Sequence, residues 1–313
     1  MLNEGYKVSV IMPVYNAQEY IERAVKSVVN LPNTGELIMI DDASSDQSLQ
    51  ISRDLEKDYK QIQVLTHADN KNRGAAETRN VGIRHSKFDY ISFLDADDYY
   101  LPNRFDKEAE IFSTDPEVDA VYGFTLAEYE SANAKKIFEK GIFAERTTFS
   151  EKVLSKDLFK ALMLGGYGYF HTSGITIKKS LLEKTGLFNP AIRYVEDTEL
   201  WYKLSLTGNL APGSIYEPIA IRWVHENNSI HQTENIKPYR RLMYHELFNW
   251  AISRPFSFEV KNLFFMALHR YGNEYRVSAL NLLLQEAKKN PVLFSSIFFY
   301  KKLHLILKSS GKN

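Results

Sequence analysis

The sequence predicts an α/β fold with a mostly parallel sheet flanked by helices, followed by an α-helical C-terminal extension. Two observations support this prediction. Short apolar, β-branched runs alternate with amphipathic helix patterns from residue 8 to residue 94, and a helical pattern alone continues from residue 236 onward. Because a strand, a helix and a further strand form a right-handed crossover, successive strands of this kind lie parallel in one sheet.

The elements of the first part follow one another in a regular order. Buried strands are expected at residues 8–12, 37–40, 62–65 and 90–94, and helices at residues 21–29, 49–55 and 74–85. Ser44, Ser45 and Asp46 offer N-caps for the second of these helices. Open α/β sheets bind ligands outside the carboxyl ends of their strands, so the residues that follow the strands are the first candidates for a site.

The middle of the chain has a mixed pattern. Strands are expected at residues 118–124, 173–177 and 219–224, and helices at residues 178–185 and 197–206. Gly186 and Gly208 stand shortly after these two helices, where a glycine commonly ends a helix.

The composition excludes several classes of protein. The 39 basic residues balance 39 acidic ones, so no net charge favours nucleic acid as a partner. The chain has no cysteine, which excludes a disulfide framework, a thiolate zinc site and a cysteine nucleophile. Residues 1–7 lack the apolar core of a signal peptide, and no uncharged apolar run reaches the ~18 residues of a transmembrane helix. These features fit a cytoplasmic protein.

The most informative motif contains three carboxylates, Asp95, Asp97 and Asp98, directly after the strand expected at residues 90–94. In an extended chain, Asp95 and Asp97 would point to one side and Asp98 to the other. Ionised carboxylates this close repel one another, and a hard divalent cation such as Mg²⁺ or Mn²⁺ would relieve the repulsion. The motif therefore indicates either a metal site for a phosphorylated substrate or an acidic turn that caps the helix after Pro102.

Polar residues also follow the first two strands. Pro13, Tyr15 and Asn16 close the first strand and open a helix whose free N–H groups suit a diphosphate. The alternative is a purely structural role, in which the proline ends the strand and the asparagine caps the helix. Asp42 closes the second strand, where a carboxylate either accepts a hydrogen bond from a nucleobase N–H or a ribose hydroxyl, or caps a turn.

Basic and histidine residues offer weaker signals. Arg73 and Arg79 lie at the helix expected at residues 74–85, where an arginine fork either pairs with phosphate or belongs to a solvated helix face. His225 follows the strand expected at residues 219–224 and either completes a metal shell through a neutral nitrogen or is an ordinary loop histidine.

Taken together, these motifs resemble the family 2 glycosyltransferases. The matching segments, in the family's order and spacing, are residues 8–16, 40–46, 72–82, 93–98, 186–189 and 194–201. Thr78 stands where the family usually has a small alanine, and this departure is expected to affect packing more than chemistry. The resemblance ends before residue 236.

The resemblance implies a GT-A-type fold and the transfer of a sugar from a nucleotide donor with inversion at the anomeric carbon. Asp197 matches the catalytic base, with Glu196 as the fallback, although Asp197 could simply cap its helix. Asp42 matches the residue that contacts the nucleobase. The residues expected at the nucleotide sugar are Pro13, Tyr15, Asn16, Asp42, Arg73, Arg79, Asp95, Ala96 and Asp97. Those expected at Mn²⁺ or Mg²⁺ are Asp95, Asp97, Asp98 and His225.

The resemblance also implies an organisation into parts. Residues 1–235 are expected to form the catalytic domain, with a nucleotide-binding half at 1–115 and an acceptor half at 116–235, and residues 236–313 the helical extension. Residues 165–173 mix glycine with aromatic residues and are expected to form a loop on the acceptor side.

The expected sugar donor and acceptor are inferred from those that are usual in the family. A UDP-sugar is the expected donor, although guanine could also satisfy Asp42. The expected acceptor is a glycan or lipid-linked hydroxyl in cell-surface polysaccharide synthesis, at the cytoplasmic face of a membrane. After Glu286 the chain has six lysines and no acidic residue. This segment is expected either to lie on an anionic membrane surface or to form a helix packed on the body or in a homodimer contact.

Two other functions compete with this interpretation. One is a non-catalytic protein of the same fold that binds a nucleotide or a glycan. The other is a sugar-1-phosphate nucleotidyltransferase, which usually carries a glycine-rich phosphate loop after its first strand. Residues 13–16 have no such loop, and this disfavours the nucleotidyltransferase.

Overall fold

The computed structural model describes residues 5–139, 145–165, 168–226, 228, 233–273, 284 and 288. The chain divides into two compact units, Met1–Gln232 and Thr233–Asn313, and each is described by itself.

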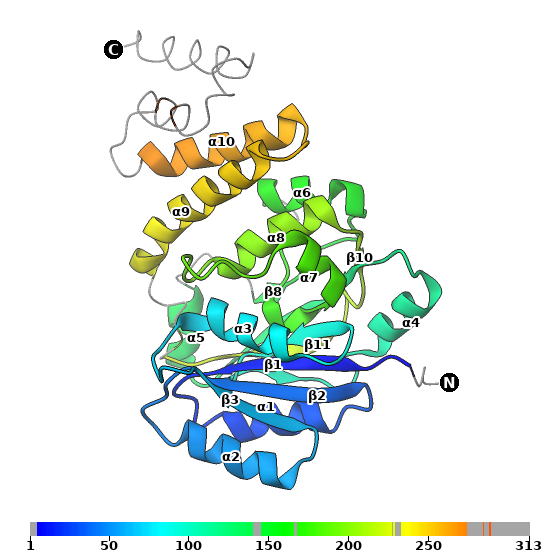
Figure 1. The fold of residues 1–313 in the computed structure, drawn as a ribbon, viewed down its shortest axis with the longest axis vertical. Coiled ribbons are helices and arrows are strands. Elements are labelled where there is room, and N and C mark those ends of the chain that lie inside the picture. The colour runs from blue at the N-terminus through cyan, green and yellow to red at the C-terminus, as the bar shows by residue number, and fades with distance from the viewer. Residues whose placement is uncertain are drawn as a thin grey trace. The chain divides into compact units, whose positions relative to one another are not determined.

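The first unit is built around a seven-stranded sheet with the strand order β10-β6-β9-β4-β1-β2-β3 (Figure 1). Its strands are β1 (Val8–Val14), β2 (Thr34–Asp41), β3 (Ile62–Thr66), β4 (Tyr90–Phe93), β6 (Ala120–Tyr122), β9 (Ile175–Lys178) and β10 (Leu210–Pro212). Neighbouring strands pair in parallel except at β9, which is antiparallel to both β4 and β6. The predicted α/β class with a mostly parallel sheet is confirmed.

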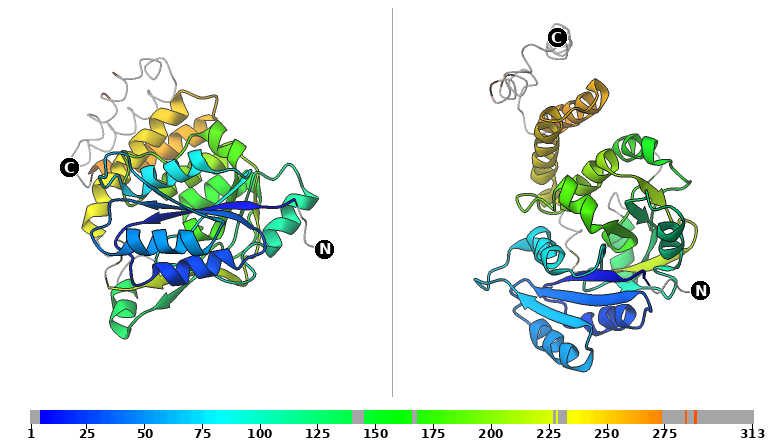
Figure 2. Two further views of the ribbon diagram at one scale, coloured as in Figure 1. Left: turned by 60° about the horizontal axis from the view of Figure 1, so that its bottom comes forward. Right: turned by 45° about the vertical axis from the view of Figure 1, so that its right-hand side comes forward.

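Helices cover both faces of this sheet. The crossover helices α1 (Ile21–Val29) and α2 (Ser48–Asp58) lie on one face, and α3 (Gly74–His85) lies on the other (Figures 1 and 2). With apolar residues on both faces, the central strands are buried along almost their whole length, as the continuous apolar runs predict.

Close packing of α3 depends on one glycine. A Cβ added to Gly82 would lie 2.4 Å from Ile11 of β1 and 2.9 Å from Ile40 of β2. The helix backbone therefore approaches the sheet more closely than any side chain would permit, and this sets the position of α3 beside the carboxyl ends of the strands.

A second sheet of four strands has the order β5-β11-β7-β8. Its strands are β5 (Tyr99–Tyr100), β7 (Phe124–Tyr129), β8 (Arg146–Thr147) and β11 (Pro218–Val224). The single strand predicted at residues 118–124 is wrong, because the chain passes from β6 of the first sheet to β7 of the second. Gly123 makes this passage, and a Cβ there would lie 2.5 Å from Ile219 of β11.

The other helices described in the first unit follow the acidic motif in sequence. They are α4 (Asp106–Thr114), α5 (Ala132–Glu139), α6 (Ser155–Leu164), a 3₁₀ turn at Thr172–Gly174, α7 (Lys179–Thr185) and α8 (Glu196–Thr207). The helices α7 and α8 agree with the predicted positions. The strand predicted from residue 173 begins at Ile175, because the 3₁₀ turn precedes it.

The capping predictions have mixed outcomes. Asp46 Oδ1 accepts a hydrogen bond from Ser48 N, at the start of α2, over 2.9 Å, so this predicted cap is present one residue outside the N-cap position. The prediction that Pro13 ends the first strand and that Asn16 caps the following helix is wrong. The strand β1 continues through Pro13, and α1 has Tyr20, not Asn16, at its N-cap.

The second unit contains α9 (Thr233–Ile252) and α10 (Phe258–Asn273), which pack against each other. Phe248 of α9 and Phe265 of α10 meet with their ring centroids 5.5 Å apart. Within the residues that the structure describes, neither helix nor any other is both long and apolar enough to cross a bilayer. Of the basic segment after Glu286, for which membrane contact is predicted, the structure describes only Lys288, so the rest of this prediction lies outside the described residues.

Candidate active site

The acidic motif forms a tight turn between β4 and β5. Asp98 N donates to Asp95 O over 3.0 Å, so the chain reverses instead of remaining extended. The expected alternation is therefore wrong: the turn brings Asp95 together with Asp98, and Asp97 points to other partners. Ala96, expected at the donor, is buried in the apolar core.

Asp98 is held by two segments from elsewhere in the chain. Its Oδ2 accepts from Ser173 Oγ over 2.9 Å, and its Oδ1 accepts from Trp223 N of β11 over 3.0 Å. The side chain is only 3% exposed. Burial, followed by the negative charges of Asp97 and Asp95, raises the pKa of Asp98 well above its usual range. Such a carboxyl group is ionised more readily when a cation lies beside it.

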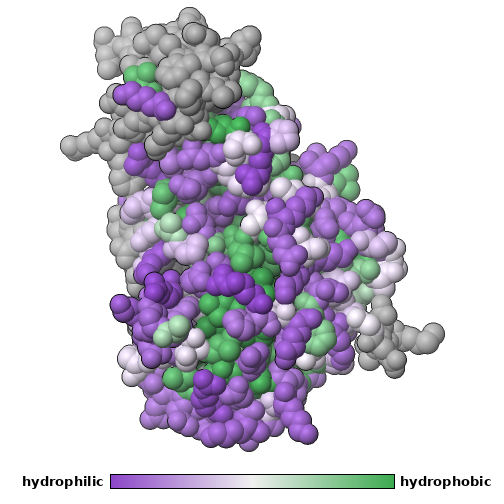
Figure 3. All heavy atoms as spheres, in the orientation of Figure 1, coloured by the Kyte–Doolittle hydropathy of each residue, from purple (hydrophilic) through white to green (hydrophobic). Residues whose placement is uncertain are grey.

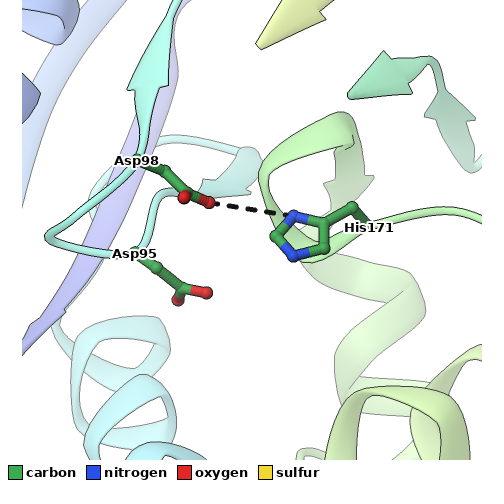
Figure 4. A group of neighbouring side chains, drawn as sticks. All are labelled: Asp95, Asp98 and His171. Carbon is green, nitrogen blue, oxygen red and sulfur yellow. Dashed lines mark ion pairs between the residues drawn. The ribbon is translucent and has the colours of Figure 1, made fainter. Parts of the chain in front are cut away.

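His171 completes a group that sequence analysis missed. One donor atom each from Asp95, Asp98 and His171 lie within 4.8 Å of one another, and His171 Nδ1 is 3.9 Å from Asp98 Oδ2 (Figure 4). Burial, followed by the charge of Arg222, lowers the pKa of His171 to about 3, so its ring is neutral near pH 7. Carboxylate oxygens suit Mg²⁺ and Mn²⁺, and a neutral imidazole suits a transition metal, so the donor set fits the expected cation.

Asp97 and His225 lie together beside this group. His225 Nε2 is 3.2 Å from Asp97 Oδ2, which also accepts from Asn228 Nδ2 over 2.9 Å. The ring of Tyr20 stacks on His225 with the centroids 4.7 Å apart, and Tyr20 Oη donates to Glu130. The predicted metal ligands are thus divided between two neighbouring groups, Asp95 with Asp98 and Asp97 with His225.

Arg79 links the acidic turn to the start of α8. Its Nη2 donates to Asp95 Oδ1 over 2.7 Å and its Nη1 to Glu196 Oε1 over 2.9 Å. Burial favours the neutral form of Asp95, but the guanidinium holds the pKa of Asp95 below its usual range. The two arginines expected at the nucleotide sugar have different surroundings in this structure. Arg79 is buried between carboxylates, and the exposed Arg73 pairs with Asp69.

The candidate base lies in the first turn of α8. Asp197 is not the helix N-cap, a position held by Val195. Its Oδ1 accepts from Thr198 N over 2.5 Å and from Thr198 Oγ1 over 3.1 Å. Burial raises the pKa of Asp197 although Arg79 opposes this effect. Glu196, the fallback base, accepts from Arg79 through Oε1.

Asp42 lies at the amino end of α3. Its Oδ1 accepts from Arg73 N over 2.6 Å and its Oδ2 from Gly74 N over 2.9 Å. Its carboxylate thus caps the amino end of α3.

The end of β1 lies next to the end of β2. Asn16, with a φ of 49°, accepts from Ser45 N over 2.8 Å through Oδ1, and its own N–H donates to Ser44 Oγ over 3.1 Å. Tyr15 is 53% exposed, so its ring is available to a ligand. Pro13 stays within β1, paired with Ile40.

The distribution of apolar and polar residues on the surface does not by itself indicate a binding site. On the face seen in Figure 3, polar residues cover most of the molecule and apolar residues emerge in a strip through the middle of the first unit. Apolar surface of this extent is ordinary for a folded protein, so the charged groups carry the argument for a site.

An acidic turn at the carboxyl edge of a mostly parallel sheet, with a carboxylate-bearing helix start beside it, is the arrangement of the GT-A class of glycosyltransferases. The chain belongs to glycosyl transferase family 2, whose family model matches residues 9–183. The family inferred from the motifs is therefore confirmed.

Individual relatives agree with this assignment. An uncharacterized glycosyltransferase of Haemophilus influenzae is 24% identical over 311 residues, which cover 97% of this chain and 100% of that protein. A putative teichuronic acid biosynthesis glycosyltransferase of Bacillus subtilis, TuaG, is 37% identical over 111 residues, 35% of this chain and 43% of TuaG.

Solved structures share the fold. The structure of S. aureus TarS 1–349 in complex with UDP-GlcNAc matches with a TM-score of 0.63 at 18% identity, covering 85% of this chain and 71% of that one. The complex of TarS 1–349 with UDP matches with a TM-score of 0.59 at 18% identity, covering 95% and 80%. At this identity the likeness establishes the fold.

Proposed function

We propose that this glycosyltransferase is metal-dependent and inverting, and moves a sugar from a UDP-sugar to a hydroxyl of a glycan or lipid-linked acceptor. The observation that carries the proposal is the ion-pair bridge through Arg79. This bridge connects Asp95 of the acidic turn to Glu196, the immediate neighbour of Asp197. This bridge supports the proposal because it joins the residues proposed for the cation to the neighbour of the residue proposed as the base.

The cation would be held by Asp95, Asp98 and His171, with Asp97 and His225 on the adjacent side. When bound, Mn²⁺ or Mg²⁺ would orient the diphosphate and stabilise the negative charge that develops on it. Asp98, the most buried of these carboxylates, would interact most strongly with the cation, because charges attract more strongly where the surroundings are less polarisable.

The chain's own contribution to the chemistry is the removal of a proton. The acceptor oxygen bonds to the anomeric carbon while the bond from that carbon to the diphosphate breaks, and the electron pair leaves with the nucleoside diphosphate. The acceptor proton passes to the Asp197 carboxylate. A single displacement of this kind inverts the configuration and requires no enzyme nucleophile. The raised pKa of Asp197 makes its carboxylate a better proton acceptor.

The donor and the biological setting are inferred from different observations. Asp42 can accept an N–H from the nucleobase, and the two TarS 1–349 structures are complexes with UDP-GlcNAc and with UDP. The named role of TuaG in teichuronic acid biosynthesis supports an acceptor in cell-surface polysaccharide synthesis. We further propose that the basic residues after Glu286 attach the protein to the inner face of the membrane. Loss of vesicle co-sedimentation on removal of residues 292–313 would support this attachment, and unchanged co-sedimentation would contradict it.

Calorimetric titration with UDP, dTDP, GDP and ADP tests the donor site, each with Mn²⁺ and with chelator. Binding of UDP that disappears with chelator is the expected result, and no binding of any nucleotide to the folded protein would overturn the proposal. Incubation with UDP-sugars and acceptors then separates the alternatives by product. Free UDP supports transfer, pyrophosphate indicates a nucleotidyltransferase, and binding without product indicates a non-catalytic protein.

A further inference from the structure

The first turn of α1 packs against the end of β11, close to the acidic turn. Tyr20 is the N-cap residue of α1, and Arg23 follows three residues later, so the two side chains are neighbours on the helix. The ring of Tyr20 stacks on His225, with the centroids 4.7 Å apart. The guanidinium carbon of Arg23 lies 4.2 Å from the centroid of the Trp223 ring. Two side chains of α1 therefore contact one short segment at the end of β11.

Tyr20 is also fixed at its hydroxyl end. Its Oη donates to Glu130 Oε1 over 2.9 Å. The backbone N of Glu130 in turn donates over 2.9 Å to the carbonyl of Val224, the residue before His225. These contacts form a closed path from the backbone beside His225, through Glu130 and Tyr20, to the face of the imidazole. The path fixes the position of the Tyr20 ring relative to the backbone of His225.

A contact with the face of an imidazole leaves its nitrogens available. Both ring nitrogens donate, accept or bind a metal in the plane of the ring, so stacking restrains this plane without occupying a nitrogen. The Nε2 atom of His225 lies 3.2 Å from Asp97 Oδ2. Tyr20 therefore restrains the ring orientation that brings Nε2 to the Asp97 carboxylate.

Arg23 acts on the backbone of the same aspartate. Its Nη2 donates to Asp97 O over 3.1 Å. Its guanidinium lies over the ring of Tyr99, at 4.6 Å, as well as over that of Trp223. Such cation–π contacts restrict a long side chain that would otherwise adopt many rotamers. Asp97 is thus held at its carbonyl by Arg23 and at its carboxylate by His225.

From these contacts, we propose that Tyr20 and Arg23 are positioning residues that hold His225 and Asp97 in the orientation that the cation requires. The inference rests on the proposed function, because it assumes that a divalent cation binds beside the acidic turn. Neither residue contacts the cation. Tyr20 acts through His225, and Arg23 acts through Asp97. Residues that orient the ligands of a metal site typically lower its affinity about 10–100-fold when they are lost.

A double-mutant cycle tests the role of Tyr20. The affinity for Mn²⁺ in the presence of UDP is measured by calorimetry on the full chain, for the unmodified protein, Tyr20→Leu, His225→Ala and the double variant. Tyr20→Leu should weaken Mn²⁺ binding about tenfold, and it should have no further effect once His225 is alanine, because the ring that it orients is then absent. Tyr20→Phe keeps the stacked ring and should retain most of the affinity. Tyr59→Leu, a change at a partly buried tyrosine elsewhere in the first unit, is the control.

Arg23→Met tests the second residue through the sign of its effect. Removal of a positive charge beside the acidic turn would by itself strengthen Mn²⁺ binding, because like charges repel. Loss of the hydrogen bond to Asp97 O should instead weaken it about tenfold. Lys26→Met removes an exposed positive charge from the same helix and should not weaken Mn²⁺ binding.

Several results would contradict these roles. Additive losses in the cycle, unchanged affinity in a folded Tyr20→Leu variant or unchanged affinity in His225→Ala would overturn the role of Tyr20. Unchanged or tighter Mn²⁺ binding by Arg23→Met would overturn the role of Arg23, and this test remains available even if Tyr20→Leu does not fold. The proposed function would still stand, because it places the cation on Asp95, Asp98 and His171. Absence of Mn²⁺ and UDP binding by the unmodified protein would overturn both.

Discussion

The first unit contains two buried arginines, Arg79 and Arg104, whose hydrogen-bond partners differ. Arg104, which is 0% exposed, donates to Glu108, to Ser92 Oγ and to the carbonyl groups of Ser173 and Ile175. Arg79, which is 5% exposed, donates to Asp95 and Glu196. Both arginines join segments that are distant in sequence, and both pay a desolvation cost.

The two groups differ in how completely their polar atoms are paired. Every nitrogen of the Arg104 guanidinium has a partner. In the Arg79 group, Arg79 Nε and Glu196 Oε2 are buried without a hydrogen-bond partner. Buried polar atoms are normally paired, so unpaired ones call for an explanation. All nitrogen atoms of the Arg104 side chain donate hydrogen bonds that help to join segments of the sheet. In the Arg79 group, one donor and one acceptor next to the proposed base remain without a hydrogen-bond partner.

Substitution of the proposed base should give the largest functional effect in the Arg79 region. Asp197→Asn should lower the transfer rate by about 10²–10⁴-fold, because the amide cannot take the acceptor proton. Donor binding and the unfolding temperature should change little. Transfer assays with a UDP-sugar measure the effect, and Asp157→Asn, an exposed carboxylate in the first turn of α6, is the control. Near-normal transfer by Asp197→Asn would remove Asp197 from the mechanism.

Replacement of each arginine by methionine should separate structure from function directly. Arg104→Met should reduce the free energy of unfolding by about 3–5 kcal/mol, since Glu108, 2% exposed, would lose its counter-charge. Arg79→Met should reduce it less, because the Asp95 side chain is 30% exposed and water can solvate it. Denaturant unfolding measures both values. Equal losses would break the comparison between the two groups.

The two histidines beside the acidic turn should differ from distant histidines in their effect on the cation. His171→Ala should weaken Mn²⁺ binding by roughly tenfold or more, in line with the loss of a group that holds or orients a metal. Transfer should also disappear on addition of chelator and return with Mn²⁺. Titration calorimetry with Mn²⁺ and UDP measures the change, with His85→Ala on the exposed part of α3 as a control. Unchanged metal dependence of His225→Ala would exclude His225 as a ligand.

The smallest expected effect is on the pH profile of transfer. Burial raises the pKa of Asp197, and the base acts only when it is ionised. Activity is therefore present above this pKa and should fall as the pH drops through it, at a higher pH than the ordinary aspartate pKa of 3.8 predicts. The residual activity of Asp197→Asn should lack this acid limb. An identical acid limb in that variant would assign it to another group.

The sequence was sufficient for much of the fold. Continuous apolar runs between turns predicted the central strands, and helical periodicity predicted α1, α3, α7 and α8, because these patterns are local. It was insufficient where burial depends on distant partners. The change of sheet at Gly123 depends on Ile219, and β5, β8 and β10 have no more than three residues each.

The sequence by itself determined the family, the sheet and the edge at which the acidic residues gather, because strand ends are set by local patterns. Only the tertiary structure decided which carboxylates meet. Asp98 joins Asp95 and His171 since partners 75 and 125 residues away, Ser173 and Trp223, hold it in the turn. Likewise Arg79 pairs with Glu196, 117 residues away. Side-chain directions in a turn follow from such long-range contacts, which no local pattern encodes.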